Sequence, residues 1–216
     1  MREWNHNDLY HRVLLRHVPP HCERALDVGC GTGAFARALA GRARVVEAVD
    51  RAPEVVEAAR AHVPQPPNVH YRVADVLAED LGSARYDVIS CLAVLHHLPF
   101  AEIVPRLRDA LRPGGVLVVL GLYRSRTLGD RLLDLVAVPL NWTGIAAFAA
   151  ARLVTAPVRT GGGEQVRPPV APPVMTLAEI REQAVALLPG AVVRRHLFWR
   201  YSLVYRRPED SGTSRR

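Results

Sequence analysis

The chain has 216 residues, of which 49% are hydrophobic and 23% charged. These values are ordinary for one globular domain with a full core and one inserted segment, and they argue against a disordered or fibrous chain. All 28 basic residues are arginine, a coding bias that weakens any inference from the net charge of +7 to a nucleic-acid partner.

Charge is unevenly distributed along the chain. Residues 1–110 contain 13 arginines and 14 acidic residues, whereas residues 111–216 contain 15 arginines and 7 acidic residues. A basic second half can attract an anionic substrate or a membrane surface, although a solvated arginine-rich surface is the simpler explanation.

The cysteines and the N-terminus bear on the cellular compartment. Cys22, Cys30 and Cys91 show no metal-ligand spacing, and their odd number favours reduced thiols and a cytoplasmic protein. The N-terminal residues lack the apolar segment of a signal peptide.

The first part of the chain predicts an α/β domain. Residues 1–23 contain apolar side chains at helical spacing before Pro19-Pro20, which indicates a short amphipathic helix. From Ala25, short apolar runs alternate with helical segments, a pattern typical of βαβ units and a parallel sheet covered on both faces. The expected strands are 25–28, 45–49, 69–73, 86–90 and 116–122, and the expected helices lie near 33–40, 53–62 and 102–111.

The alternation stops after Tyr123. Residues 127–156 are strongly apolar, and residues 157–173 are rich in glycine and proline. Thr176 and Glu179 then form a predicted capping box that opens a helix to about residue 188. The chain closes with β-rich runs at 191–199 and 201–205 and a polar, frayed tail from 208.

The strongest motif is a glycine-rich turn between the first strand and a helix. It reads Asp27-Val28-Gly29-Cys30-Gly31-Thr32-Gly33. Glycines permit a sharp turn and the close approach of a ligand, and the N–H groups at the helix start suit a polar or anionic group. The spacing also fits the NAD-binding pattern, with Ala34 in the third glycine position.

Three acidic residues favour a different ligand from NAD. Asp27 lies at the end of the first strand, where it would repel a pyrophosphate but can hold an ammonium group. Asp50 and Asp75 end the next two strands at the same sheet edge. A carboxylate at Asp50 can accept both ribose hydroxyls, and one at Asp75 can accept from an adenine amino group.

The sequence resembles the class I S-adenosylmethionine (SAM)-dependent methyltransferases of type 11 or 12. The matching segments are LDVGCGTGAFA (26–36), VEAVDRAPEVVEAAR (46–60), VADV (73–76), YDVISCLAVLHHLP (86–99) and LRPGGVLVVLGLY (111–123). The resemblance implies a Rossmann-like, seven-stranded, mostly parallel sheet with an antiparallel last strand. It also implies an enzyme that uses SAM, without a metal.

The resemblance assigns roles to the cofactor-binding residues. Gly29, Gly31 and Gly33, with Cys30 and Thr32 between them, would border the methionine part. Asp50 would bind the ribose, and Arg51 would lie beside the adenine. The remaining contacts would be Ala74, Asp75 and Val76 around the adenine and Cys91 and Leu92 beside the sulfonium. Alternatively, Asp50 and Asp75 have only a structural role in capping the ends of their strands.

The reacting side offers two candidate bases, His97 and, less strongly, His96. Both follow the fourth strand, and histidine titrates near neutral pH. Alternatively, the two rings only orient this loop. A base is needed only if the acceptor must lose a proton near the transition state.

Two segments are candidates for covering the site. In similar enzymes the N-terminal segment closes over the cofactor, so Trp4, His6 and Tyr10 would contact cofactor or substrate; alternatively Trp4 and Tyr10 only pin the helix. The apolar insertion, with Trp142, would form an acceptor pocket for an apolar or aromatic molecule, while contact with a membrane is the weaker interpretation. His196, Trp199, Arg200 and Tyr201 are interpreted as packing residues.

The predicted organisation is an N-terminal helical lid (1–23), a methyltransferase domain (24–207) with a substrate lid (124–173), and a flexible tail (208–216). We expect a monomer or homodimer that methylates O, N or C of a small, apolar or aromatic acceptor, a secondary metabolite or a lipid-like molecule. The alternatives are a non-catalytic SAM-binding protein, a nucleic-acid methyltransferase and an NAD-dependent oxidoreductase. The fourth strand lacks the signature of base-amine methylation, which argues against a nucleic-acid partner.

Overall fold

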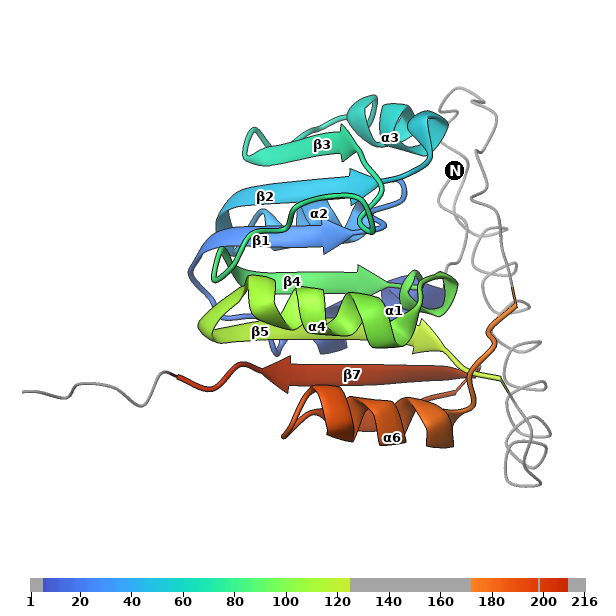
Figure 1. Ribbon diagram of the computed structural model, residues 1–216. Coiled ribbons are helices and arrows are strands. Elements are labelled where there is room, and N and C mark those ends of the chain that lie inside the picture. The colour runs from blue at the N-terminus through green and yellow to red at the C-terminus, as the bar shows by residue number, and fades with distance from the viewer. Residues whose placement is uncertain (1–5, 125–171, 198, 210–216) are drawn as a thin grey trace, which may run out of the picture.

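The computed structural model describes residues 6–124, 172–197 and 199–209. Within them lies one seven-stranded sheet (Figure 1). Its strands in chain order are β1 (Cys22–Val28), β2 (Ala43–Asp50), β3 (Val69–Val73), β4 (Tyr86–Leu92), β5 (Leu111–Leu122), β6 (Val192–Arg195) and β7 (Arg200–Arg206).

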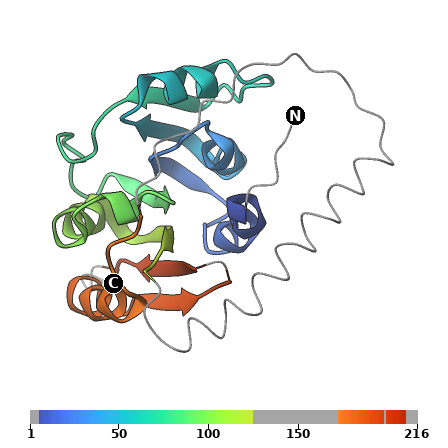
Figure 2. The same ribbon diagram turned by 90° about the vertical axis from the view of Figure 1, so that its right-hand side faces the viewer.

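Helices cover both faces of this sheet, and each face has its own cluster of buried apolar side chains (Figures 1 and 2). The helices are α1 (His6–Leu15), α2 (Ala34–Leu39) and α3 (Pro53–Arg60) on one face, and α4 (Phe100–Ala110) and α6 (Leu177–Leu187) on the other. A short 3-10 helix, η1 (Leu95–His97), follows β4.

The strand order is β3-β2-β1-β4-β5-β7-β6, and β1 to β5 are parallel. β7 is antiparallel to both of its neighbours, β5 and β6. The predicted fold class is therefore confirmed, including the antiparallel last strand. Because β1 lies between β2 and β4, the strand order reverses there, and open α/β sheets bind ligands at the carboxyl ends of strands flanking such a reversal.

Local sequence signals account for most of the element boundaries. The capping box is present: Thr176 Oγ1 accepts from the Glu179 N–H, and Glu179 accepts from the Thr176 N–H at 2.7 Å. One boundary differs, because β5 begins at Leu111 rather than at residue 116. Leu111 pairs with Tyr86, and the register then shifts, so the Pro-Gly-Gly sequence that follows is an irregularity within a strand.

The N-terminal helix α1 is part of the core. Tyr10 and Leu14 are buried with the apolar side chains of α2 and the central strands. The helix ends at Leu15, before the two prolines, as predicted. The described part of the predicted lid is thus packed on a sheet face, and closure over a cofactor stays a prediction.

Several predicted segments lie outside the described residues. They include almost all of the insertion 124–173, with its apolar stretch 127–156, and most of the tail 208–216. In the part of the chain that is described, no helix has the length and apolar character needed to cross a membrane.

Candidate functional site

The glycine-rich turn connects β1 to α2 at the carboxyl edge of the sheet, which faces the viewer in Figure 2. The backbone of Gly29, Gly31 and Gly33 adopts φ values of 64°, 53° and 79°, in the left-handed region. The Cys30 N–H donates to the Val49 carbonyl at 3.0 Å, which ties the turn to β2.

Gly29 and Gly31 are needed for different reasons. A Cβ on Gly29 would lie 2.0 Å from Val94 Cγ2, because the loop after β4 packs directly against this glycine. A Cβ on Gly31 would meet no protein atom within 4 Å. Gly31 therefore borders open space at the carboxyl edge, whereas Gly29 joins the β1 turn to the β4 loop.

Asp50 lies against the glycine turn, as predicted. Its Oδ2 accepts from the Gly31 N–H at 3.0 Å and its Oδ1 from the Ala52 N–H at 3.0 Å. The Asp50 carbonyl accepts from the Ala74 N–H at 2.9 Å, which brings the end of β3 to the same place. Each carboxylate oxygen can accept a second hydrogen bond, so Asp50 retains capacity for ligand hydroxyls.

Asp75 is at the same edge but exposed, and its Oδ1 accepts from the Leu77 N–H at 2.9 Å. This bond is typical of an aspartate that begins a turn. Its neighbour Val76 is buried, whereas Ala74 is half-buried. The predicted contacts of these residues with adenine stay predictions.

Asp27 is a buried carboxyl group beneath the turn, with 2% of its surface exposed. Its Oδ1 accepts from the Ser90 hydroxyl at 2.6 Å, and its Oδ2 has no hydrogen-bond partner among the described residues. Burial raises the pKa of Asp27, the hydrogen bond from Ser90 lowers it, the charge of Asp50 raises it and the Ala36 N–H lowers it, with a net pKa of about 7. A cationic ligand group near Asp27 would compensate this burial.

Asp27→Asn should be more stable than the wild type at alkaline pH. Native Asp27 keeps its proton up to about pH 7, whereas an unfolded aspartate loses it near about 3.9. Between these values the unfolded state binds fewer protons, so the free energy of unfolding of the wild type falls as pH rises. The neutral variant avoids this loss, which amounts to at most about 4 kcal/mol. Urea unfolding of both proteins across this pH range measures the difference between their free energies of unfolding. A difference that does not change with pH would contradict the raised pKa of Asp27.

The histidine pair follows β4 on η1, across the strand reversal from the glycine turn. The His97 N–H donates to the Val94 carbonyl at 2.8 Å, and the two imidazole rings are 3.9 Å apart. Burial, followed by the charges of His97 and Arg200, lowers the pKa of His96 to about 4. Burial and the charge of Arg51 lower the pKa of His97. His97 is less buried than His96, and its lowered pKa favours the neutral imidazole.

The loop that carries these histidines contains a strained residue. Ala93 has φ of 57°, and its N–H donates to the Leu120 carbonyl at 2.7 Å. A left-handed alanine costs about 1–2 kcal/mol, a strain common at functional sites. Ala93 and Val94 together fix where η1 begins.

The other predicted cofactor residues differ in exposure. Cys91 is fully buried in the core with α4, and Cys30 is 7% exposed. Burial raises the pKa of both thiols, so they stay protonated, and all three cysteines of the chain are free. Leu92 is half-buried at the end of β4, and Arg51 and Thr32 are exposed.

The predicted lid residues are only partly described. Tyr10 is 8% exposed; its hydroxyl donates to the Leu197 carbonyl at 3.4 Å, and its ring lies 4.9 Å from that of His196. These contacts favour the interpretation that Tyr10 anchors α1. Trp4 and Trp142, and the side chain of His6, lie outside the described part of the structure.

Two contributors to the site were not predicted from the sequence. Val94 packs against Gly29, and Tyr71 supports Gly33, to whose carbonyl its hydroxyl donates at 3.5 Å. An apolar residue in a loop and a tyrosine in a strand give no sequence signal for either contact.

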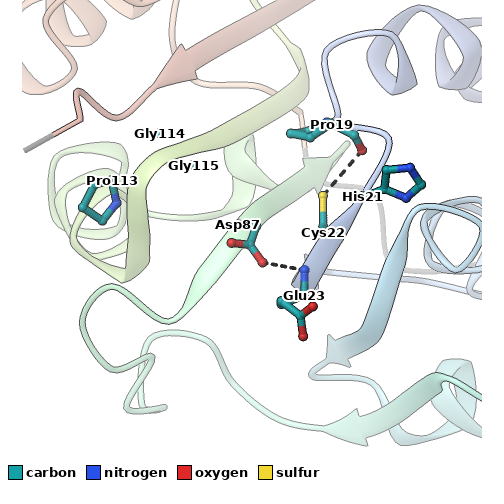
Figure 3. Close-up of a pocket in the computed structure, with 8 residues that line it drawn as sticks. All are labelled: Pro19, His21, Cys22, Glu23, Asp87, Pro113, Gly114 and Gly115. Atoms are coloured by element: carbon teal, nitrogen blue, oxygen red, sulfur yellow. Dashed lines mark hydrogen bonds between the residues drawn. The ribbon is translucent and has the colours of Figure 1, made fainter.

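A cavity of about 300 Å³ lies at the opposite edge of the sheet, where the strands begin (Figure 3). Asp87 lies in it and accepts from the Glu23 N–H at 2.8 Å. Its distance from the glycine turn along the strands separates it from the candidate site. Among the described residues, no three His, Cys, Asp or Glu side chains come together to hold a metal.

The sheet order and the glycine turn define a Rossmann-like domain whose candidate ligand site lies at the β1–β4 reversal. Solved structures with this fold include the YcgJ protein from Bacillus subtilis, with a TM-score of 0.62 and 17% identity, covering 87% of this chain and 71% of that chain. The N-methyltransferase NodS from Bradyrhizobium japonicum, in complex with S-adenosylhomocysteine (SAH), has a TM-score of 0.61 and 17% identity. The match covers 94% of this chain and 87% of that chain. At these identities, the likeness shows the fold alone.

Relatives found by sequence comparison have higher identity to this chain than these solved structures have. A model of the methyltransferase domain matches residues 26–119. An uncharacterised methyltransferase of Mycobacterium tuberculosis is 34% identical over 206 residues, 95% of this chain and 98% of the relative. A ubiquinone biosynthesis O-methyltransferase of Xylella fastidiosa is 40% identical over 128 residues, 57% of this chain and 50% of the relative. The chain belongs to the class I SAM-dependent methyltransferases.

Proposed function

We propose that this enzyme transfers the methyl group of SAM to O, N or C of a small, apolar or aromatic acceptor in the cytoplasm. The observation that carries the proposal is the geometry at Gly31. This glycine opens to free space, and its N–H is bonded to Asp50 at the strand reversal. The buried carboxyl group of Asp27, with one oxygen without a partner among the described residues, fits a cationic ligand group.

The residues present fit the parts of SAM. Asp50 would bind the ribose hydroxyls and Asp27 the ammonium group, while Asp75 and its neighbours would border the adenine. When bound, SAM supplies a methyl group on a positively charged sulfur. The protein then has mainly to position the acceptor and exclude water, which contribute a large part of the rate enhancement.

His97 is the better candidate for a base. Its lowered pKa keeps the imidazole neutral at pH 7, so it can accept a proton from a hydroxyl or amine. The name of one sequence relative, an O-methyltransferase of ubiquinone biosynthesis, supports a small-molecule acceptor.

Calorimetry with SAM, SAH and NAD tests the cofactor assignment. We expect both sulfur compounds to bind with dissociation constants well below about 1 mM, which corresponds to more than about 4 kcal/mol of binding free energy. NAD should bind more weakly, because three carboxyl groups surround the turn. Preferential binding of NAD would contradict the proposal.

Transfer of labelled methyl groups separates an enzyme from a non-catalytic binding protein. The protein is incubated with methyl-labelled SAM and with separate small-molecule, RNA and protein fractions of a bacterial extract. We expect label in the small-molecule fraction. Label in RNA would favour a nucleic-acid methyltransferase, and SAH binding without transfer to any fraction would favour a repurposed SAM-binding protein.

A further inference from the structure

The segment that follows β3 carries Asp75 and returns across the sheet face that α4 covers (Figure 1). We call residues 74–79 the β3 loop. Local hydrogen bonds close its backbone, because the Asp75 carbonyl accepts from the N–H groups of Ala78 and Glu79, both at 3.0 Å. Val76 is 5% exposed and belongs to the apolar cluster that α4 forms with this face of the sheet. The β3 loop is therefore packed against α4.

Arg106 of α4 holds the β3 loop with its guanidinium group. Its Nη1 donates to the Leu77 carbonyl at 2.7 Å, and its Nη2 donates to the Glu79 carbonyl at 2.5 Å. The Arg106 side chain is half-buried. A planar guanidinium holds two acceptors in a fixed arrangement, and hydrogen bonds from an ionised donor are stronger than those between neutral groups. Arg106 therefore attaches the loop to α4 at two points.

The other side-chain contact of this loop with a charged residue is an ion pair near the surface. Arg72 Nη2 lies 2.9 Å from Glu79 Oε2, and 51% and 32% of these two side chains are exposed. Exposed ion pairs contribute little to stability, because water and salt screen them. The two hydrogen bonds from the half-buried Arg106 are thus the stronger restraint on the loop.

Leu77 connects Arg106 to the carboxylate of Asp75. Its carbonyl accepts from Arg106, and its N–H donates to Asp75 Oδ1 at 2.9 Å. Before Asp75, the Ala74 N–H donates to the Asp50 carbonyl at 2.9 Å, so the backbone is fixed on both sides of the aspartate. The single hydrogen bond from Leu77 leaves Oδ2 of Asp75 able to accept from a ligand.

We propose that Arg106 is a positioning residue for recognition of the cofactor's nucleobase: through Leu77 it fixes the carboxylate of Asp75, which accepts from the adenine amino group. The proposal rests on the proposed function, in which the adenine borders Asp75. Hydrogen bonds weaken steeply outside a narrow range of distance and angle, so a loop released from α4 would lose this contact. Arg106 acts through the loop and needs no contact of its own with the cofactor.

The test compares SAH with its deaminated analogue, S-inosylhomocysteine, by calorimetry on the full chain. The analogue has a carbonyl oxygen where adenine has the amino group, so it presents a second acceptor to Asp75. A site that hydrogen-bonds a ligand group rejects an analogue that lacks this group. We expect the wild type to bind SAH at least about tenfold more tightly than the analogue. General damage to the site weakens both ligands alike and leaves the ratio of their dissociation constants unchanged.

Two arginines of α4 provide a matched pair of variants. Arg106→Met should reduce the preference for SAH to about threefold or less, whereas Arg108→Met should keep it. Arg108 is also half-buried and also donates to a backbone carbonyl, that of Leu187 at 3.1 Å, but this carbonyl lies at the end of α6. Arg106→Lys keeps the charge without the planar fork, so it should retain part of the preference. It also provides the measurement if Arg106→Met fails to fold.

Asp75→Ala shows whether Arg106 acts through this carboxylate. The variant should lose the preference for SAH over the analogue. Adding Arg106→Met to it should then change the ratio no further, because both substitutions remove the same contact. A further change in the ratio would show that Arg106 acts on the nucleobase by another route and would contradict the proposal.

Equal binding of SAH and S-inosylhomocysteine by the wild type would overturn the proposal, as would a full preference in Arg106→Met. An equal loss of preference in Arg108→Met would also overturn it, since that loss would come from α4 as a whole. If the wild type binds neither ligand, the proposed function itself fails. The titration of the wild type with SAH therefore separates the two kinds of failure.

Discussion

Gly31→Ala is expected to weaken the binding of SAH by at least about tenfold, since filling a packed space costs about 1–3 kcal/mol. The new methyl group would enter the open space at the turn, where no protein atom lies within 4 Å of the new Cβ. The left-handed backbone at Gly31, with φ of 53°, adds a loss of protein stability, about 1–2 kcal/mol for a residue with a Cβ. Calorimetry measures the affinity and urea unfolding the stability.

Gly190→Ala is the matched control for this substitution. Gly190 has φ of 88°, and a Cβ there would also meet no atom within 4 Å, but it follows α6 away from the glycine turn. Gly190→Ala should therefore lose similar stability and keep its affinity for SAH. If Gly31→Ala binds SAH as well as Gly190→Ala does, the space at Gly31 does not hold the cofactor.

Gly29→Ala should destabilise the protein by about 2–5 kcal/mol, the sum of overpacking and a left-handed alanine. The cause is the Val94 side chain, whose Cγ2 would lie 2.0 Å from the new Cβ. The collision should displace the loop that carries η1. Unfolding in urea gives the change in stability, and the NMR signals of His96 and His97 report displacement of the loop.

Val94→Ala should partly restore Gly29→Ala, because it removes both γ-methyl groups and leaves only a Cβ at 2.9 Å. The two substitutions are in contact, so the double variant should deviate from additivity by at least about 1 kcal/mol. The single variant Val94→Ala completes the double-mutant cycle. Strict additivity would show that the β4 loop does not touch the turn.

The α/β fold was predictable because its signals are local. Alternating apolar runs and helices specify a parallel sheet, and Thr176 with Glu179 specifies the start of α6. The start of β5 was not predictable, because a shift in its pairing with β4 absorbs the Pro-Gly-Gly sequence. Sequence alone does not show where a strand accommodates an irregularity.

The site was predictable where spacing determines position. The glycine turn and Asp50 meet because both follow neighbouring parallel strands, and the structure joins them by a hydrogen bond. The contact of Val94 with Gly29 depends on tertiary packing between residues far apart in the sequence. Arg200 is interpreted from the sequence as a packing residue, and in the structure it is half-buried at the carboxyl edge, where the antiparallel β7 begins.

The reversal of strand order places the proposed cofactor-binding residues and the reacting side of the site in two separate stretches of sequence. Everything proposed to hold the adenosyl and methionine groups, apart from the residues at the end of β4, comes before residue 77, whereas the candidate bases His96 and His97 come after residue 95. Substitutions in the later stretch, other than at Arg106, can therefore change which acceptor is methylated and leave the nucleotide pocket intact. New acceptor specificities can thus evolve on a constant cofactor half.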